Sequence, residues 1–327
     1  MTEGVGPDAG SDVGEATPAL GGGVLATATL LTFLRPTAWV VGLAGFLSRG
    51  GVILAVVPIL VLPSLAGLAT AFGPLLNRLV LGAMTADVAV AAAIVITLVA
   101  IVVVALLLVG GAVDGWLVGA AAADLGVEVP SAARPTAAML TAARAIAHLP
   151  LVIVFVAMLG PVIAATYDEL LVPGDLGTPV FVRVVGAVPI PIAIVVITAL
   201  LCDALGALAV RVVALDGASL AGAIPRALAV AGRHPSDVGV AFVASISVVV
   251  IVFGPALVAA SVVFDGLRRL LADDSGLPAL TVAVLLLVGT WLGALLLAGI
   301  ASTWRAHAWS SAYLRATAAA AGPSRDW

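Results

Sequence analysis

Two ionisable residues, Arg49 and Asp203, lie inside stretches that are otherwise apolar enough to cross a membrane. A charge at the centre of a bilayer costs about 2.5–3.5 kcal/mol on insertion scales, so both are candidates for function. They can line the path of a solute, or they can form a structural ion pair. Arg49 also lies in the sequence SRGG at positions 48–51, where a break in the helix would let it reach water. We favour a structural role and expect the two side chains to meet, because pairing offsets two insertion penalties.

Three histidines and one group of polar residues are the other candidates for chemistry. The histidines, expected at one membrane face, are His148, His234 and His307. They could ligate zinc, but no two share a helix at metal-ligand spacing, so we interpret them as interfacial residues without a ligand. The polar group is Tyr167, Asp168, Glu169 and Asp175. Its carboxylates could bind a cation, but a solvated acidic loop is the simpler interpretation.

Known catalytic motifs are missing from the sequence. It has no glycine-rich phosphate loop, no Gly-x-Ser-x-Gly elbow and no His-Glu-x-x-His. Its single cysteine, Cys202, excludes a cysteine-based zinc cluster and an intramolecular disulfide framework. We therefore expect no catalytic residue, no metal and no cofactor.

The composition predicts a membrane protein. Hydrophobic residues make up 63 % of the chain and charged residues 10 %, whereas soluble domains carry about 45–50 % and about 25 %. Lipid must therefore act as solvent for much of the chain, and membrane lipids are the expected partners. The net charge of −4 and the dispersed arginines argue against nucleic acid. Nothing in the sequence indicates a protein partner.

The apolar stretches predict an all-α, polytopic helical bundle with about six transmembrane helices. The expected spans are about 37–62, 86–109, 149–166, 188–210, 238–263 and 278–301. They belong to a single membrane domain, 20–320. Residues 1–19 are expected to form a disordered acidic tail, since nothing there offsets the entropy of ordering, and 321–327 a second tail.

Arginine counts predict the orientation, because loops rich in positive charge stay in the cytoplasm. Nine arginines fall on the side of the two termini and four on the other, so both termini are expected in the cytoplasm. Three of the nine, in or beside the predicted interfacial helices, are candidates for contact with anionic lipid head groups. These are Arg144, Arg226 and Arg233.

One pattern occurs three times, starting near 30, 142 and 227. Each copy has an amphipathic helix, a basic or imidazole residue just before a proline, an outgoing span and a returning span. We expect the three amphipathic helices to lie nearly parallel to the membrane, with bends at Pro36, Pro150 and Pro235. The bundle would then consist of three repeats of an interfacial helix plus a helical hairpin. A continuous helix over 137–166 would remove the second copy.

Glycines at four-residue spacing indicate close helix crossings. They are Gly111, Gly115 and Gly119 near the second span, and Gly289 and Gly293 in the last. Packing within the chain is favoured over dimerisation, because a six-helix bundle needs several tight crossings.

The Arg-Pro-x-x-Trp start, the three helix-plus-hairpin units and the closing segment STWRAHAWSSAYLRA carry a family resemblance. Over about residues 30–318 the chain looks like a large set of uncharacterised six-span proteins from halophilic archaea. More distantly, it resembles the membrane domain that precedes the catalytic barrel of some bacterial glycerophosphodiester phosphodiesterases. The barrel and its metal ligands are absent here. The resemblance therefore implies a fold and a membrane location, but no reaction.

These observations favour an integral protein of the plasma membrane without catalytic activity, acting as an accessory or packing module. The alternative is a permease or exporter of a small or lipid-like solute, with Arg49 and Asp203 lining the path. A polar-lined cavity at mid-membrane would distinguish the second from the first.

Overall fold

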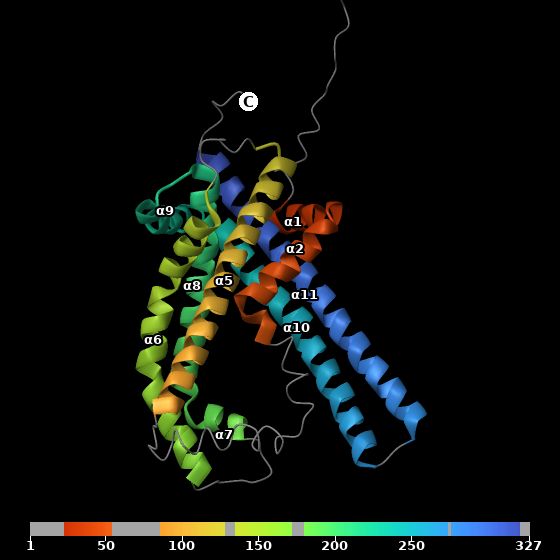
Figure 1. The fold of residues 1–327 in the computed structure, drawn as a ribbon. Helices are drawn as coiled ribbons and strands as arrows, with labels where there is room; N and C mark the ends of the chain where they lie inside the picture. Colours follow the sequence, from red (N-terminus) through yellow and green to blue (C-terminus); the bar gives the residue numbers. More distant parts are fainter. Residues whose placement is uncertain (1–22, 54–85, 128–134, 172–179, 274–275, 321–327) are drawn as a thin grey trace, which may run out of the picture.

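The computed structural model describes residues 23–53, 86–127, 135–171, 180–273 and 276–320, and every regular element in these ranges is a helix (Figure 1). Five helices are long and apolar enough to cross a membrane, and a sixth span is added if the bent pair Val24–Leu34 and Thr37–Gly51 counts as one. The expected all-α fold is therefore confirmed for the described residues, and the five or six long apolar helices fit a multi-pass membrane protein. The expectations for 1–19, 54–62, 321–327 and Asp175 lie outside the described residues.

Five long helices run up and down the molecule. They are α5 (Ala86–Asp124), α6 (Ala137–Leu171), α8 (Pro189–Asp216), α10 (Pro235–Ala272) and α11 (Leu277–Ala320). Successive helices run in opposite directions, and α5, α6 and α8 form one group while α10 and α11 form a hairpin that diverges from it (Figure 1). The helices extend beyond the predicted spans by up to 19 residues, as α11 does past 301. The reason is that Ala-rich sequence remains helical after its hydropathy falls.

Shorter helices complete the fold at the two ends. They are α1 (Val24–Leu34), α2 (Thr37–Phe46), the π-helical turn η1 (Leu47–Gly51), α7 (Val180–Ala187) and α9 (Leu220–Arg233). Helices α1 and α9 lie across the long helices at one end of the bundle, and α7 lies at the other (Figure 1). The axes of α1 and the α2–η1 segment differ by 109°.

The expected bends form at two of the three prolines. Helix α1 ends before Arg35, and Pro36 caps α2. His234 adopts φ −127° between α9 and α10, and Pro235 takes the first position of α10, where its missing N–H costs nothing. The bend expected at Pro150 is wrong: α6 continues through this proline as one helix from 137 to 171. Membrane helices tolerate such a proline, since losing one backbone hydrogen bond does not stop propagation on either side.

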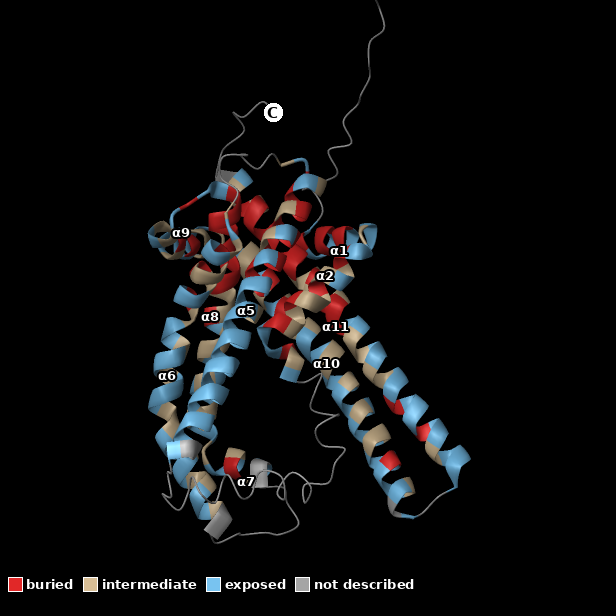
Figure 2. Ribbon diagram, viewed as in Figure 1, coloured by how far each residue is buried: buried red, intermediate tan, exposed pale blue. Residues whose placement is uncertain are grey.

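Burial divides the bundle into two parts, which we call the compact half and the apolar half (Figure 2). The compact half consists of α1, α2, η1 and α9 with 110–125, 137–148, 202–216, 235–245 and 298–316. The apolar half consists of 89–109, 149–169, 189–201, 246–271 and 277–297. Nearly all of the buried residues lie in the compact half, where Trp309 and Tyr313 are the largest fully buried side chains.

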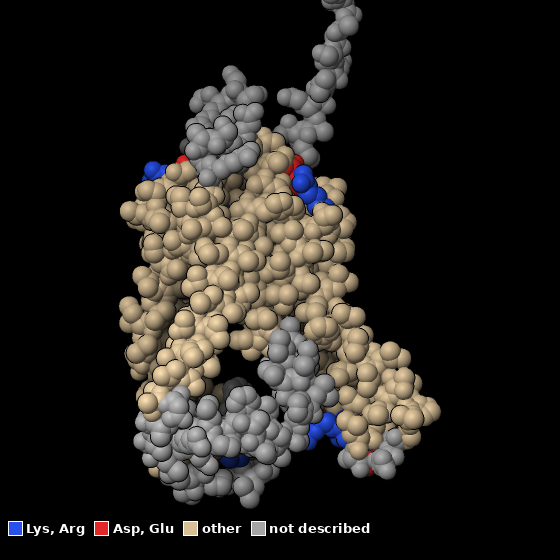
Figure 3. Space-filling model, viewed as in Figure 1, with Lys and Arg blue, Asp and Glu red and all other residues tan. Residues whose placement is uncertain are grey.

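The apolar half has the dimensions of a bilayer. No residue in 89–109, 149–169 or 189–201 is buried, and most of these side chains are large and apolar. At 1.5 Å per residue, 89–109 spans about 30 Å, the thickness of the hydrocarbon core. In Figure 3, charged side chains appear only near the two ends of the molecule, and the surface between them is uncharged. Lipid would cover this surface in a membrane.

Glycines allow the closest crossings of the compact half. A Cβ on Gly299 of α11 would lie 2.5 Å from the carbonyl oxygen of Trp39 in α2, and one on Gly42 would lie 2.5 Å from that of Gly299. This reciprocal pair was not predicted. Of the predicted glycines, Gly111 would meet the backbone of α6 at Ala137.

Gly115, one turn further along α5, would place a Cβ 2.9 Å from Leu140 Cδ1. At the remaining predicted positions a Cβ would have no neighbour within 4 Å, so the structure does not place a tight crossing there. They are Gly119, Gly289 and Gly293. The last two lie in the apolar half, where α10 and α11 are held by larger side chains.

Candidate functional site at the boundary of the two halves

Six charged side chains from five helical elements gather around one cavity at the boundary of the two halves. They are Arg49 (η1), Asp114 (α5), Arg144 (α6), Asp203 and Arg211 (α8), and Arg305 (α11). We call this group the charged cluster. The cavity has a volume of about 30 Å³ and is also lined by Ala207, Ser302, Ala306 and Trp309.

Two carboxylates connect the cluster. Asp114 Oδ1 pairs with Arg49, and its Oδ2 lies 3.1 Å from an Arg144 terminal nitrogen. The other Arg144 terminal nitrogen lies 3.6 Å from Asp203 Oδ1, and Asp203 Oδ2 pairs with Arg305. The expectation of a direct Arg49–Asp203 contact is therefore wrong. The two residues belong to one network, but Asp114 and Arg144 stand between them.

Arg211 is held differently. It is 2 % exposed, and it has no carboxylate within 4 Å among the described residues. Its guanidinium donates to the carbonyl oxygens of Ala207 at 2.7 Å and Ala306 at 2.6 Å, and to Ser310 Oγ at 3.2 Å. These acceptors are neutral. A buried cation with only neutral acceptors is costly unless another charge lies near.

Local backbone geometry places Arg49 at the cluster. The helix breaks at the predicted position: Arg49 has φ −99° and ψ 23°, and Gly50 has φ 101°. Only glycine takes such a positive φ at little cost. The break turns the arginine toward α5, which passes close to this turn at Gly110: a Cβ there would lie 3.1 Å from Ser48 Oγ.

Close approach of α5 and α6 places the next two members. Gly111 and Gly115 bring the helices together at Thr141, whose hydroxyl donates to the Leu107 carbonyl oxygen at 2.9 Å. Arg144 follows Thr141 on α6 and reaches the buried Asp114. Its expected role at lipid head groups is therefore wrong, because both of its terminal nitrogens face carboxylates inside the protein. Arg226 and Arg233 are exposed on α9, which suits contact with head groups.

A second layer of polar contacts fixes the first helices on α11. Thr303 Oγ1 donates to the Ala38 carbonyl oxygen at 2.8 Å. Thr32 Oγ1 lies 3.1 Å from His307 Nδ1. At the far edge of the compact half, Tyr313 donates to Asp216 at 2.7 Å. The first two contacts hold α1 and α2 against the buried face of α11, and the third joins α11 to α8.

The other predicted sites are dispersed. The described residues contain no group of three potential metal ligands, and His148, His234 and His307 lie on different helices or at a helix end. Glu169 pairs with Arg183 of α7 at 2.6 Å, so it stabilises the far end of the bundle.

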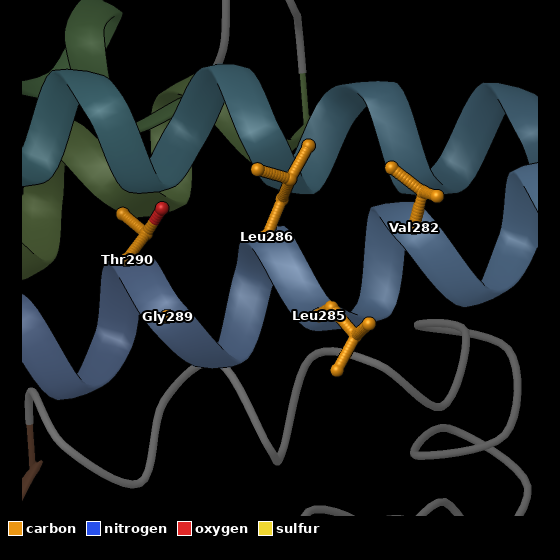
Figure 4. A pocket seen from close by; sticks show the side chains of 5 residues that line it. All are labelled: Val282, Leu285, Leu286, Gly289 and Thr290. Carbon is orange, nitrogen blue, oxygen red and sulfur yellow. The ribbon is translucent and has the colours of Figure 1, made fainter.

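A larger but open hollow lies on the surface of the apolar half. It has a volume of about 500 Å³ and is lined by Val282, Leu285, Leu286, Gly289 and Thr290. Figure 4 shows Val282, Leu286 and Thr290 directed toward α10 and Leu285 directed away from it. One hydroxyl is the only polar side-chain group in this lining, so the hollow offers no charged group for chemistry. The charged cluster is therefore the candidate site.

Comparison of the sequence with models of protein families, with characterised proteins and with solved structures found no match.

Proposed function

We propose that the chain is an integral plasma-membrane protein without catalytic activity that acts as an accessory or packing module. The observation that supports this best is the distribution of charge. In the described part of the chain, the charged cluster is confined to the boundary of the compact half, and the charged residues of the apolar half lie only near its far end. Five of the six members of the cluster form ion pairs with one another, so most of its charge is engaged within the protein rather than along a path for a solute.

The proposed topology places the compact half and both termini in the cytoplasm. Nine arginines against four support this orientation. Cysteines in place of Gly10 and Ala320, in a Cys202→Ser background, should resist an impermeant reagent applied to intact cells, whereas Asp175→Cys should react. The reverse labelling pattern would contradict the orientation.

We also propose a reduced internal repeat. Helix α1 with α2, and α9 with α10, each combine a transverse helix with a second helix that begins at or just after a proline. These two units support the expected pattern. The middle unit departs from it, since α6 runs from 137 to 171 as one helix and has no separate transverse helix before it.

Reconstitution into sealed vesicles tests the absence of transport. Vesicles loaded with a small anion, a small cation or a fluorescent lipid should release or redistribute it no faster with the protein than without it. Arg49→Gln should leave these rates unchanged. If the protein raises the flux above the protein-free rate, and Arg49→Gln lowers that flux again, the proposal of a packing module is wrong.

The permease remains the second candidate, because one observation favours it. The charged cluster holds four arginines and two aspartates around its cavity, an excess of two positive charges. Such a cavity suits an anion. Selective release of the anion in the same vesicle assay would support a permease over a packing module.

A further inference from the structure

The charged cluster contains more positive charge than its own carboxylates neutralise. We propose that its cavity binds one monatomic anion, of which chloride is the plain example. Both carboxylates are already engaged in ion pairs with arginines, and Arg211 has only neutral acceptors. An anion in the cavity would lower the cost of burying this excess charge.

Two of the residues that line the same cavity carry buried donors without a hydrogen-bond partner. Trp309 is 2 % exposed, and its indole Nε1 is buried with no hydrogen-bond partner. Arg144 Nε is likewise buried and unpartnered, although both of its terminal nitrogens are engaged. Buried N–H groups without an acceptor are rare, because each costs the desolvation of a donor. An anion in the cavity would accept hydrogen bonds from the Trp309 and Arg144 N–H groups.

Arg211 adds further donor capacity. A guanidinium has five N–H groups, and the three hydrogen bonds of Arg211 each use a different nitrogen. The remaining N–H groups belong to a buried cation that lines the cavity. Charge-assisted donors and a neutral indole N–H together form the kind of shell that a chloride ion requires after losing its water.

Size selects a monatomic anion over an oxyanion. The cavity volume of about 30 Å³ corresponds to roughly two water positions, at about 10–15 Å³ of such space for each. A phosphate or a lipid phosphodiester brings four oxygens around phosphorus, which exceeds this space. Chloride fits with a water molecule beside it.

Equilibrium binding of radioactive chloride to the purified full-length protein tests the proposal, with gluconate as the replacement anion. The expected result is one saturable site per chain. Trp309→Phe keeps an aromatic ring but removes the N–H, and it should weaken chloride binding about ten-fold or more. The matched control is Trp304→Phe on the same helix. The Trp304 indole N–H donates to Thr29 Oγ1 at a distance of 3.0 Å, and neither residue lines the cavity. This control should leave chloride affinity unchanged.

Three results would overturn the site. The first is the absence of saturable chloride binding in the unaltered protein. The second is equal chloride affinity in Trp309→Phe and the unaltered protein. The third is displacement of chloride by inorganic phosphate at comparable concentration, which would mean that the cavity takes oxyanions. The site is independent of the proposed function, because a bound anion can be structural in a packing module that transports nothing.

Discussion

The compact half and the apolar half are built from the same five long helices, yet the helices of the compact half are covered by protein and those of the apolar half expose the apolar surface that lipid would cover. Along α6, Leu140 and Ala143 are each 1 % exposed, whereas Ile153 is 70 % exposed. The helix does not change at this point; its neighbours do. In the compact half, α1, α2 and α9 cover the long helices, and small residues let them come close. Hydrophobicity alone therefore does not decide where a membrane protein packs.

The position of the charged cluster is related to the same two halves. All six members of the charged cluster lie where protein begins to replace lipid as the surroundings. Here helices are close enough for carboxylates to bridge arginines from different elements. The predictions below compare matched positions in the two halves.

The largest effect is expected from Asp114→Asn. This carboxylate pairs with both Arg49 and Arg144, so its loss takes a partner from two arginines at once. Breaking a buried ion pair costs about 3–5 kcal/mol. The free energy of unfolding in detergent should fall by about this amount, whereas Ile153→Ala, in the apolar half, should change it by about 0.5 kcal/mol or less. Equal losses in both variants would mean that the compact half and the apolar half do not differ in how much they contribute to stability.

A smaller effect is expected at the crossing of α2 and α11. In Gly299→Ala, the new Cβ would lie 2.5 Å from the Trp39 carbonyl oxygen, which is backbone and cannot move aside cheaply. Overpacking of this kind costs about 1–3 kcal/mol.

Gly293→Ala, on the same helix but with open space around it, provides the control. It should stabilise the protein by about 0.5–1 kcal/mol, since alanine favours helices over glycine. Thermal unfolding midpoints of the two variants should therefore shift in opposite directions. Shifts in the same direction would mean that the helices do not cross at Gly299.

Tyr313→Phe should have an effect of about 1–2 kcal/mol. The variant removes the hydroxyl that donates to Asp216 at 2.7 Å, and it leaves the ring packing intact. Chemical denaturation of the purified protein should show a lower midpoint with an unchanged slope. An unaltered midpoint would mean that this bond contributes nothing to the compact half.

The smallest effect is expected from Arg226→Gln on α9. The arginine is exposed, so unfolding in neutral detergent should change by about 0.5 kcal/mol or less. In nanodiscs of anionic lipid, the variant should lose about 1 kcal/mol relative to the unaltered protein, as expected for one arginine at such a surface. The same loss in zwitterionic nanodiscs would argue against a head-group contact.

The sequence predicts the helices well and the charged cluster only in part. Long apolar runs predict the spans, and the SRGG segment predicts the break at Arg49, because both are local properties. Asp114 was missed because the predicted span ends at 109, although α5 continues to 124. Arg211 and Arg305 are two of the nine arginines that the sequence places on the side of the two termini, where an arginine beyond a span is ordinarily solvated. Only the tertiary structure shows that α1, α2 and α9 cover these positions.

The three prolines that were expected to bend the chain also show what the sequence alone does not determine. Pro36, Pro150 and Pro235 follow similar residues, yet only the second lies within a continuous helix. The sequence indicates where a helix can break. Whether it does break depends on the packing of the helices on either side.

The most direct test of the account is the solvent around α6. Single spin labels at 140, 143, 153 and 156, in a Cys202→Ser background in bilayers, report collisions with oxygen and with a water-soluble nickel complex. The account predicts high oxygen and low nickel accessibility at 153 and 156, where the side chains face lipid, and low accessibility to both reagents at 140 and 143, where they are buried. High nickel accessibility at 153 and 156 would place water along the apolar half and contradict the division on which the proposed function rests.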